Sequence, residues 1–373
     1  MRPHVPVLVI LAAASLLWYG TGARTAIAHK ASAVSAASHI VVTQATARHI
    51  DRLMRAALVV QHLAAVSLAI GDHGTVIYAK GYGYRDLARH LPATPQTIYN
   101  IASMSKQYTA ACVLLLQEDG KLNIDDKLSR YLPNFPHGNS ITVREVLNHT
   151  SGLSDYLDLI DNATLTPAKV RAALDKLKLK FRPGSRFDYS NSNYIVAGLV
   201  VEKASGMSFD EFLRSRILYP LHLQSTTVGT SPLYLPGGAT GYTVIKGRTV
   251  PVNPRADDAA TLDFPDGGIN SNVSDLIRWD NALDSGRVLN QELLAMMFTP
   301  SPYRADWPGG YALGVGLDSV GKHREIVHTG GWIGFTGINA TLPDDRFAVV
   351  LLSNTDTFDK TALAQRIIRL FYR

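Results

Sequence analysis

Apolar residues recur with a helical period near the start of the chain and then alternate. One stripe predicts an amphipathic helix over residues 46–59, formed by Ile50, Leu53, Met54 and Ala57. Apolar residues at every second position follow from Val66 to Ile70, and Asp72-His73-Gly74 carries turn residues. Because a second alternating run extends to Tyr84, this segment predicts a β-hairpin.

The pattern becomes helical over residues 101–220. Helix starts are marked by two capping boxes and a proline at a first helical position: Thr142 with Glu145, Ser208 with Glu211, and Thr166-Pro167. Residues 225–265 are rich in turn residues and predict one hairpin around Lys246-Gly247, after which helices are expected to begin near Asp275 and Gln291.

Strand-like patterns return after Gly310. Three strands are expected over residues 311–317, 324–342 (with interruptions) and 346–352, and residues 361–371 predict a closing amphipathic helix.

Sheet-forming segments therefore lie at both ends of the sequence. The fold class that accommodates them is α+β: an antiparallel sheet flanked by terminal helices, with a mainly helical domain inserted between its first and later strands. We expect residues 46–100 and 265–373 to form the sheet domain and residues 101–264 the inserted helical domain.

The first 28 residues predict an export signal. Arg2 precedes an apolar run from Val5 to Trp18, and small residues end at Ala28. A run of this length is shorter than the roughly 20 residues that span a membrane, so no stable membrane anchor is expected. We therefore expect a mature chain that starts near His29 with a loose segment over residues 29–45, and a periplasmic or secreted location.

Composition and charge exclude several functional classes. The 373 residues carry a formal net charge of +6, without the clustered Lys and Arg that nucleic-acid binding requires. A single cysteine, Cys112, excludes an intrachain disulfide and a thiolate zinc cage, and its apolar surroundings favour a core position. The histidines lack paired ligand spacing, so neither a metal nor another cofactor is expected.

Candidate chemistry begins with Ser103-Met104-Ser105-Lys106 at the start of an apolar helix. Side chains three residues apart on a helix have Cβ atoms about 5–6 Å apart, so the Lys106 amine can reach the Ser103 hydroxyl. A serine needs such a base or cation to attack at neutral pH. The same spacing recurs at Ser319 and Lys322, but Gly321 and strand-like flanks argue against a shared helical face there.

Two further short motifs carry little weight alone. Tyr189-Ser190-Asn191 falls on a loop before a helix, where a Tyr-x-Asn sequence is common in turns. His328-Thr329-Gly330-Gly331 ends a short apolar strand, and paired glycines in a strand mark a close approach of backbone or ligand.

Taken in order, the three motifs resemble those of the serine β-lactamase and penicillin-binding protein family, most closely its class C β-lactamase and serine D-alanyl-D-alanine carboxypeptidase branch. The resemblance spans most of the mature sequence and includes five further segments: Gly81-Tyr82-Gly83-Tyr84, residues 95–99, Gly120-Lys121-Leu122, His149-Thr150-Ser151-Gly152-Leu153 and Gly267-Gly268.

The resemblance implies a role for each motif residue. Ser103 would be the acylated nucleophile, Lys106 its proton partner, and Tyr189 the relay to the leaving group and the deacylating water. Asn191, His328 and Thr329 would bind the substrate, and the backbone N–H groups of Ser103 and Gly331 would form the oxyanion hole.

The resemblance implies an exported hydrolase that forms an acyl-enzyme with D-alanyl or other D-peptide amides. Two departures bear on the substrate: His328 stands where class C β-lactamases carry lysine, and Gly331 lacks a hydroxyl that many carboxylate-binding members have. A carboxylesterase, a class C-like β-lactamase and a penicillin-binding sensor without turnover are the alternatives. The expected partners are small molecules or short peptides, such as peptidoglycan stem peptides or β-lactams.

Two histidines, His328 and His149, carry further expectations. His328 titrates near pH 6.5 when unperturbed, so its charge is expected to change activity between pH 5 and 8. His149, Ser151 and Asp155 are too close in sequence, within a glycine-containing turn, to favour a Ser/His/Asp triad. His149 is interpreted instead as a hydrogen bonder that fixes its loop.

Overall fold

Seven antiparallel strands form the main sheet of the computed structural model, which describes residues 40–160, 165–252 and 264–372. Their order across the sheet is β3-β2-β1-β12-β11-β10-β9. The strands are β1 Ala65–Asp72, β2 Thr75–Asp86, β3 Leu91–Pro92, β9 Gly316–Val320, β10 His323–Trp332, β11 Phe335–Leu342 and β12 Phe347–Ser353. The first long strand pairs with the last, with Val66 opposite Ser353, so the expected α+β sheet built from both ends of the chain is confirmed.

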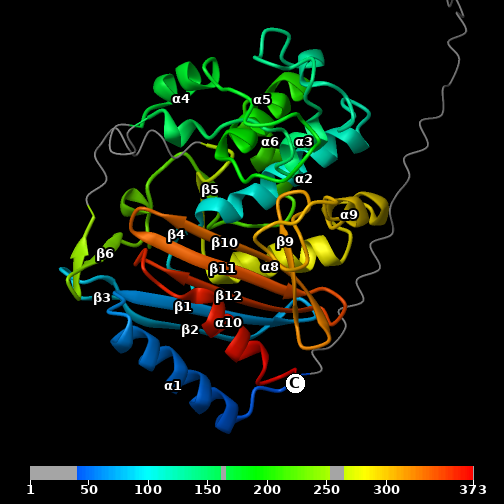
Figure 1. Ribbon diagram of the computed structural model, residues 1–373. Coiled ribbons are helices and arrows are strands. Elements are labelled where there is room, and N and C mark those ends of the chain that lie inside the picture. The colour runs from blue at the N-terminus through cyan, green and yellow to red at the C-terminus, as the bar shows by residue number, and fades with distance from the viewer. Residues whose placement is uncertain (1–39, 161–164, 253–263, 373) are drawn as a thin grey trace, which may run out of the picture. The chain divides into compact units, whose positions relative to one another are not determined.

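Helices cover both faces of the sheet (Figure 1). The outer face packs against α1 Gln44–Val60 and α10 Lys360–Ile368, and the inner face against α2 Ser105–Glu118 and α8 Val273–Asp284. All residues of β1, β11 and β12 are consequently buried, although antiparallel strands commonly leave one face in water. The predicted stripe of the first helix is its buried face.

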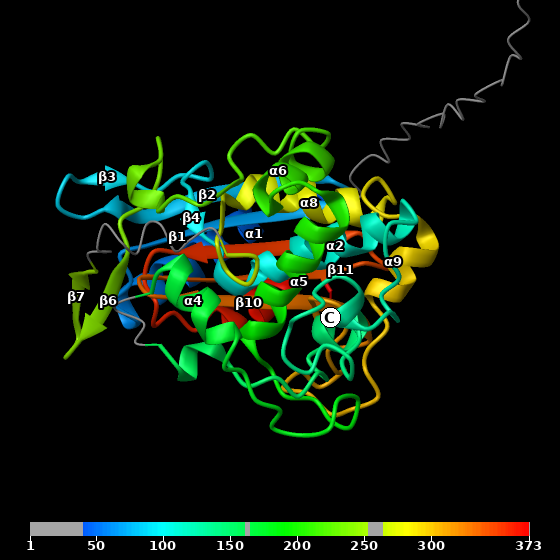
Figure 2. The same cartoon turned by 90° about the horizontal axis from the view of Figure 1, so that it is seen from above.

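The remaining helices gather around α2 on the inner side of the sheet. They are α3 Val143–Leu147, α4 Pro167–Leu174, α5 Asn191–Ser205, α6 Phe209–Leu213 and α9 Gln291–Met297. Figure 2 shows α2 and α5 together in front of the strands. The division of the chain at residues 100 and 265 into two domains stays a prediction.

Two small sheets complete the described structure. One joins β4 Tyr99–Asn100, β8 Ile269–Ser271 and β5 Thr227–Val228; the other is the hairpin β6 Tyr242–Ile245 and β7 Arg248–Pro251, predicted around Lys246-Gly247.

The strand expected over residues 311–317 is wrong. Gly310 and Gly314 have φ of 96° and 80°, in the left-handed region that an extended strand does not use, and β9 begins only at Gly316. A Cβ on Gly314 would lie 2.6 Å from the Lys106 carbonyl oxygen. The irregular backbone therefore allows this segment to pack closely against α2.

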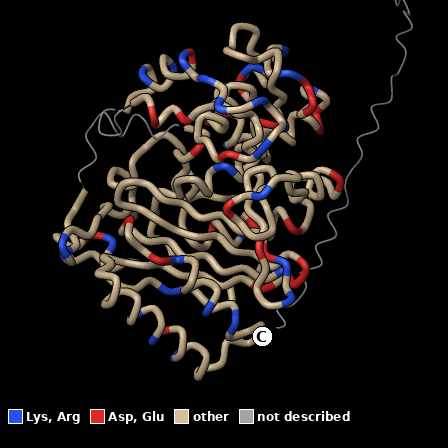
Figure 3. Tube along the Cα trace, viewed as in Figure 1, with Lys and Arg blue, Asp and Glu red and all other residues tan. Residues whose placement is uncertain are grey.

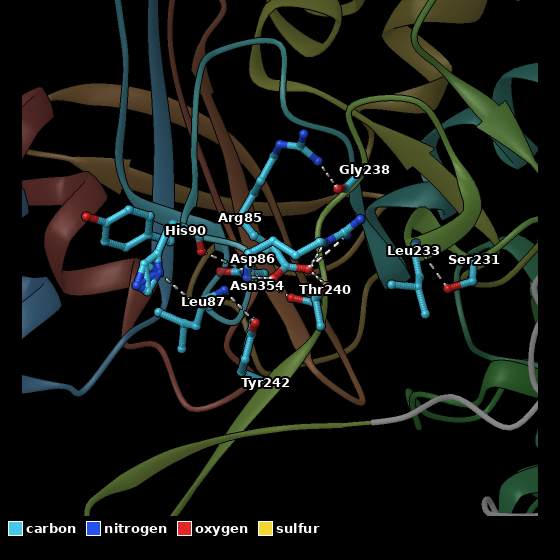
Figure 4. A network of polar contacts seen from close by, with 12 residues as sticks. Arg85, Asp86, Leu87, His90, Ser231, Leu233, Gly238, Thr240, Tyr242 and Asn354 are labelled. Carbon is cyan, nitrogen blue, oxygen red and sulfur yellow. Dashed lines mark hydrogen bonds and ion pairs between the residues drawn. The ribbon is translucent and has the colours of Figure 1, made fainter.

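A network of hydrogen bonds holds the segment before β6 against the end of the sheet (Figure 4). Arg85 donates to the Gly238 carbonyl at 2.8 Å, and Thr240 donates to Asp86 at 2.9 Å. The Asn354 amide, just after β12, donates to the Thr240 carbonyl at 2.9 Å. Segments more than a hundred residues apart in sequence are thereby held together at this edge.

Charged residues of both signs are interspersed along the trace (Figure 3). Within the described residues, no helix is long and apolar enough to cross a bilayer. The predicted export signal, residues 1–28, and the expected loose segment up to residue 39 lie outside the described residues.

Candidate active site

Ser103 lies in a single 3-10 turn, Ala102–Met104, immediately before α2. Ala102 adopts a left-handed φ of 47°, which costs an L-residue roughly 1–2 kcal/mol. Two neighbours hold this turn: the Asn100 side chain accepts the Ala102 N–H at 2.9 Å, and Gly330 of β10 packs against the Ile101 carbonyl. The strained turn leaves Ser103 partly exposed at the seam between sheet and helices.

Lys106 is fully buried beneath Ser103, with its amine surrounded by three acceptors. Nζ lies 3.0 Å from Ser103 Oγ, 2.9 Å from Asn191 Oδ1 and 2.7 Å from the main-chain carbonyl oxygen of Asp266. The three N–H bonds of a lysine ammonium match these three acceptors. The amine is therefore fixed within proton-transfer distance of the candidate nucleophile.

Asn191 is oriented by Asp155, which sequence reasoning did not assign to the site. Asp155 Oδ2 accepts from both the main-chain N–H and the side-chain amide of Asn191, at 2.8 and 3.0 Å. The Asn191 carbonyl oxygen is thereby turned toward Lys106, and one amide hydrogen is left for another acceptor.

Tyr189 lies on the loop before α5, as expected, with its ring centroid 5.1 Å from Lys106 Nζ. Its ring belongs to a cluster whose members include His149, Tyr194, Trp307, Tyr311 and His328. Packing on several sides restricts the phenol to a narrow range of positions beside the amine.

His149 fixes the loop that carries Tyr189. Its Nδ1 accepts from the main-chain N–H of Ser190 at 3.3 Å and from the Asn193 amide at 3.0 Å, which places its proton on Nε2. Ser151 donates to Asn193 rather than to His149, and Asp155 accepts from Asn191. These three residues therefore form no triad, in agreement with the sequence-based interpretation.

His328 is buried in β10, and both ring nitrogens are engaged. Nδ1 lies 2.6 Å from the Thr329 carbonyl, to which it donates, so Nε2 accepts from the Tyr311 hydroxyl at 3.1 Å. Burial and the nearby Lys106 charge lower the pKa of His328 to about 3. The expectation that His328 changes charge between pH 5 and 8 is therefore contradicted by its environment.

A cleft of about 580 Å³, including its open mouth, lies in front of Ser103. Tyr189, Asn191 and Gly331 line it with Ser103, whereas Lys106 lies beneath. His328 lines a separate small cavity between the inner face of the sheet and α8, and alternation along β10 puts Thr329 on the opposite face from His328. The structure thus brings four predicted residues to the cleft, while the substrate-binding roles of His328 and Thr329 and the oxyanion hole stay predictions.

Sequence reasoning missed Asp266 and Tyr156, which also line the cleft. The Tyr156 hydroxyl donates to Asp266 Oδ2 at 3.1 Å. Burial raises the pKa of Asp266 to about 6, although the Lys106 charge opposes the shift. The one signal in the sequence that could have indicated Asp266 was its place directly before the Gly267-Gly268 pair.

Cys112 is fully buried in α2, and burial raises the pKa of its thiol above its usual range. Within the described ranges, no group of three or more His, Cys, Asp or Glu residues could hold a metal ion.

Comparison with known proteins shows a family match over most of the chain. The Beta-lactamase family model matches residues 48–371. Penicillin-binding protein 4* of Bacillus subtilis (strain 168) is 29% identical over 316 residues, which cover 80% of this chain and 69% of that protein.

Two solved structures extend the likeness to three dimensions. The octameric penicillin-binding protein homologue from Pyrococcus abyssi superposes with a TM-score of 0.77 and 27% identity, covering 87% of this chain and 77% of that one. The D-amino acid amidase from Ochrobactrum anthropi SV3, complexed with L-phenylalanine amide, gives a TM-score of 0.75 and 25% identity, covering 87% and 98%. The chain therefore belongs to the beta-lactamase family and is a serine hydrolase of that family.

Proposed function

We propose that this hydrolase cleaves D-aminoacyl or D-peptide amide bonds through an acyl-enzyme on Ser103. The observation that carries the proposal is the position of Lys106, whose buried amine contacts Ser103 Oγ at the base of the cleft. A serine activated by an adjacent base is the arrangement that covalent acyl transfer needs.

The proposed steps balance in protons and bonds. Ser103 Oγ attacks the scissile carbonyl carbon while its proton passes to neutral Lys106, and the C–N bond then breaks. The departing amine takes the proton held by Lys106, relayed through Tyr189, which leaves an ester on Ser103 and returns Lys106 to its neutral form. Water, deprotonated through Tyr189, hydrolyses that ester to a carboxylic acid and restores the serine hydroxyl.

The surroundings of the cleft support an amide or aminopeptidase-type substrate over one that ends in a free carboxylate. His328 is held in its neutral form, and Gly331 supplies no hydroxyl. A related protein is named a D-amino acid amidase and has been solved with D-phenylalanine as well as with L-phenylalanine and its amide, so its name rather than its bound ligands supports substrates of D configuration.

A substrate panel tests the proposal. D-aminoacyl amides, D-Ala-D-Ala peptides, short-chain 4-nitrophenyl esters and a chromogenic cephalosporin would be assayed with wild type, Ser103→Ala and the matched control Ser319→Ala. We expect hydrolysis of D-aminoacyl amides that is lost in Ser103→Ala and kept in Ser319→Ala, because Ser319 lies on β9 without a helical lysine partner.

A fluorophosphonate label located by mass spectrometry provides a second readout at Ser103. A label that persists in Ser103→Ala would place the nucleophile elsewhere. A stoichiometric burst without steady-state turnover would instead support a penicillin-binding sensor.

We also propose export of the protein, from the signal-like pattern of residues 1–28. Cell fractionation followed by N-terminal sequencing tests this, with a mature start near His29 as the expected result. An intact Met1 in the cytoplasmic fraction would contradict it.

A further inference from the structure

Asp266 is a carboxylate in the cleft that the proposed chemistry does not use. It is 6% exposed and lines the cleft together with Ser103. Only its main-chain carbonyl contacts Lys106, at 2.7 Å. The backbone of Asp266 is therefore separated from the nucleophile by a single lysine amine, and no step of the proposed chemistry uses its carboxylate.

The Asp266 carboxylate forms no ion pair with a described Lys, Arg or His side chain. Its one side-chain hydrogen-bond donor among the described residues is the neutral hydroxyl of Tyr156, at 3.1 Å. A carboxylate can accept several hydrogen bonds, and a buried one is costly without a counter-charge. The Coulombic neighbours of Asp266 are Lys106, which favours its charge, and Asp155, which opposes it.

The other walls of the cleft are mainly apolar. Leu157, Leu165, Phe264 and Trp332 contribute hydrophobic side chains, and none of the described lining residues is Lys, Arg or His. A substrate carboxylate would find no counter-charge on these walls, whereas a substrate ammonium would find Asp266. The carboxylate and the apolar walls together favour a ligand that is cationic at one point and apolar elsewhere.

We propose that Asp266 is the specificity-determining residue that binds the α-ammonium of an acyl donor carrying an apolar side chain. The inference rests on the proposed function, because the ammonium of such a donor is attached next to the carbonyl carbon that Ser103 attacks. A group that recognises it must therefore lie in the same cleft as the nucleophile, and Asp266 lines that cleft together with Ser103. Substrates with a free amino terminus are preferred for this reason over N-acylated ones.

Competition assays test the proposal without requiring amide cleavage. Hydrolysis of 4-nitrophenyl butyrate at pH 7 reports Ser103 chemistry, and D-phenylalanine amide and 3-phenylpropanamide are added as competitors that differ in the amino group alone. At this pH the carboxylate of Asp266, with a pKa of about 6, is mostly ionised, and an α-amino group of pKa about 7.7 is mostly protonated. The ratio of the two inhibition constants measures recognition of the ammonium.

We expect wild type to prefer the amino competitor and Asp266→Asn to reduce this preference by about 10- to 100-fold, the range for a hydrogen bond to a charged group. The matched control is Asp284→Asn, a partly buried carboxylate whose pKa is likewise raised, to about 7, by desolvation, and which lies outside the cleft lining. That variant should keep the wild-type ratio.

Two results would overturn the proposal. One is a wild-type enzyme that binds both competitors equally, which needs no variant to interpret. The other is an Asp266→Asn enzyme that loses ester activity and both affinities together, as expected for a residue that only supports Lys106 or Tyr156. Failure of the proposed function gives a different result: D-phenylalanine amide would compete through Asp266 but remain uncleaved.

Discussion

Tyr189 lines the cleft together with Ser103, and its hydroxyl can be removed without losing its ring packing. Phenylalanine keeps the contacts with His149 and Lys106 but removes the hydroxyl. We expect Tyr189→Phe to lower turnover by about 10²- to 10⁴-fold, the usual contribution of general acid-base catalysis. Steady-state assays on an ester measure it, and full activity would leave Lys106 as the sole proton partner.

His328 is expected to stay neutral throughout the physiological range, because burial and Lys106 lower its pKa to about 3. The pH profile of kcat/KM on a neutral ester should therefore show no His328 ionisation between pH 5 and 8. His328→Gln, whose amide can also accept and donate, should reproduce the inflections of the wild-type profile. An inflection in this range that disappears in the variant would show that His328 titrates.

Single residues differ in how far sequence alone could predict them. Ser103 and Lys106 were recognisable because one helical turn separates them, so their proximity follows directly from their spacing in the sequence. Asp266 approaches Lys106 from 160 residues further along the chain, so only the folded structure brings them together. The charge of His328 was mispredicted for a related reason, since a sequence carries the ordinary pKa of an imidazole but not its burial.

At the scale of elements, the contact between β10 and the turn before α2 determines where the nucleophile lies. A Cβ on Gly330 would come 2.2 Å from the Ile101 carbonyl oxygen, whereas a Cβ on Gly331 would meet nothing within 4 Å. Gly330→Ala should therefore displace the turn and lower kcat/KM at least about 10²-fold, while Gly331→Ala, the matched control, should remain folded. Ester kinetics and circular dichroism on both variants check this, and equal activities would contradict it.

The contact between α8 and β11 contains a buried carboxyl group with an unsatisfied oxygen. Asp280 Oδ1 accepts from the Asn339 amide at 2.7 Å, but its Oδ2 has no partner. Burial raises the pKa of Asp280 well above its usual value, so the folded state retains a proton that the unfolded state releases, and stability falls as pH rises between the two pKa values. Asp280→Asn should therefore raise the free energy of unfolding by about 1–3 kcal/mol at pH 8, with a smaller gain at pH 4. Urea unfolding at both pH values measures this; a loss of stability at pH 8 would contradict it.

Elements with strong local signals were predicted well, and the elements shaped by tertiary contact were not. The amphipathic stripe and the caps were sufficient for α1, α3 and α6. Residues 311–315 have strand-like composition, but close packing of Gly314 against α2 imposes an irregular backbone. The hydrophobic pattern of this segment contains no information about its packing against α2.

For the whole molecule, the sheet depends on helices from both ends of the described chain. Ile367 of α10 is fully buried against the outer face, so Ile367→Ala should lower the free energy of unfolding by about 2–5 kcal/mol. Val59 of α1 is 75% exposed, and Val59→Ala should change the free energy of unfolding by less than about 0.5 kcal/mol. Urea denaturation of the two variants distinguishes them, and similar losses would contradict the assignment of α10 to the core.

A single sheet built from both ends of the chain was foreseeable at this scale because strand patterns occur at both ends of the sequence, and strands of one sheet need partners. The strand order, including the pairing of β1 with β12, and the register were not foreseeable, since both strands are buried on both faces and burial therefore does not select one register.

The three acceptors around Lys106 also determine where its lone pair points once the ammonium has lost a proton. A neutral amine has two hydrogens to donate, and the carbonyl oxygens of Asn191 and Asp266 can only accept, so each of them requires one. The lone pair is then directed at Ser103 Oγ, the one neighbour of the three that carries a hydrogen of its own. In its neutral form the amine is consequently aligned to receive the serine proton, and no rotation of the lysine side chain has to precede the attack.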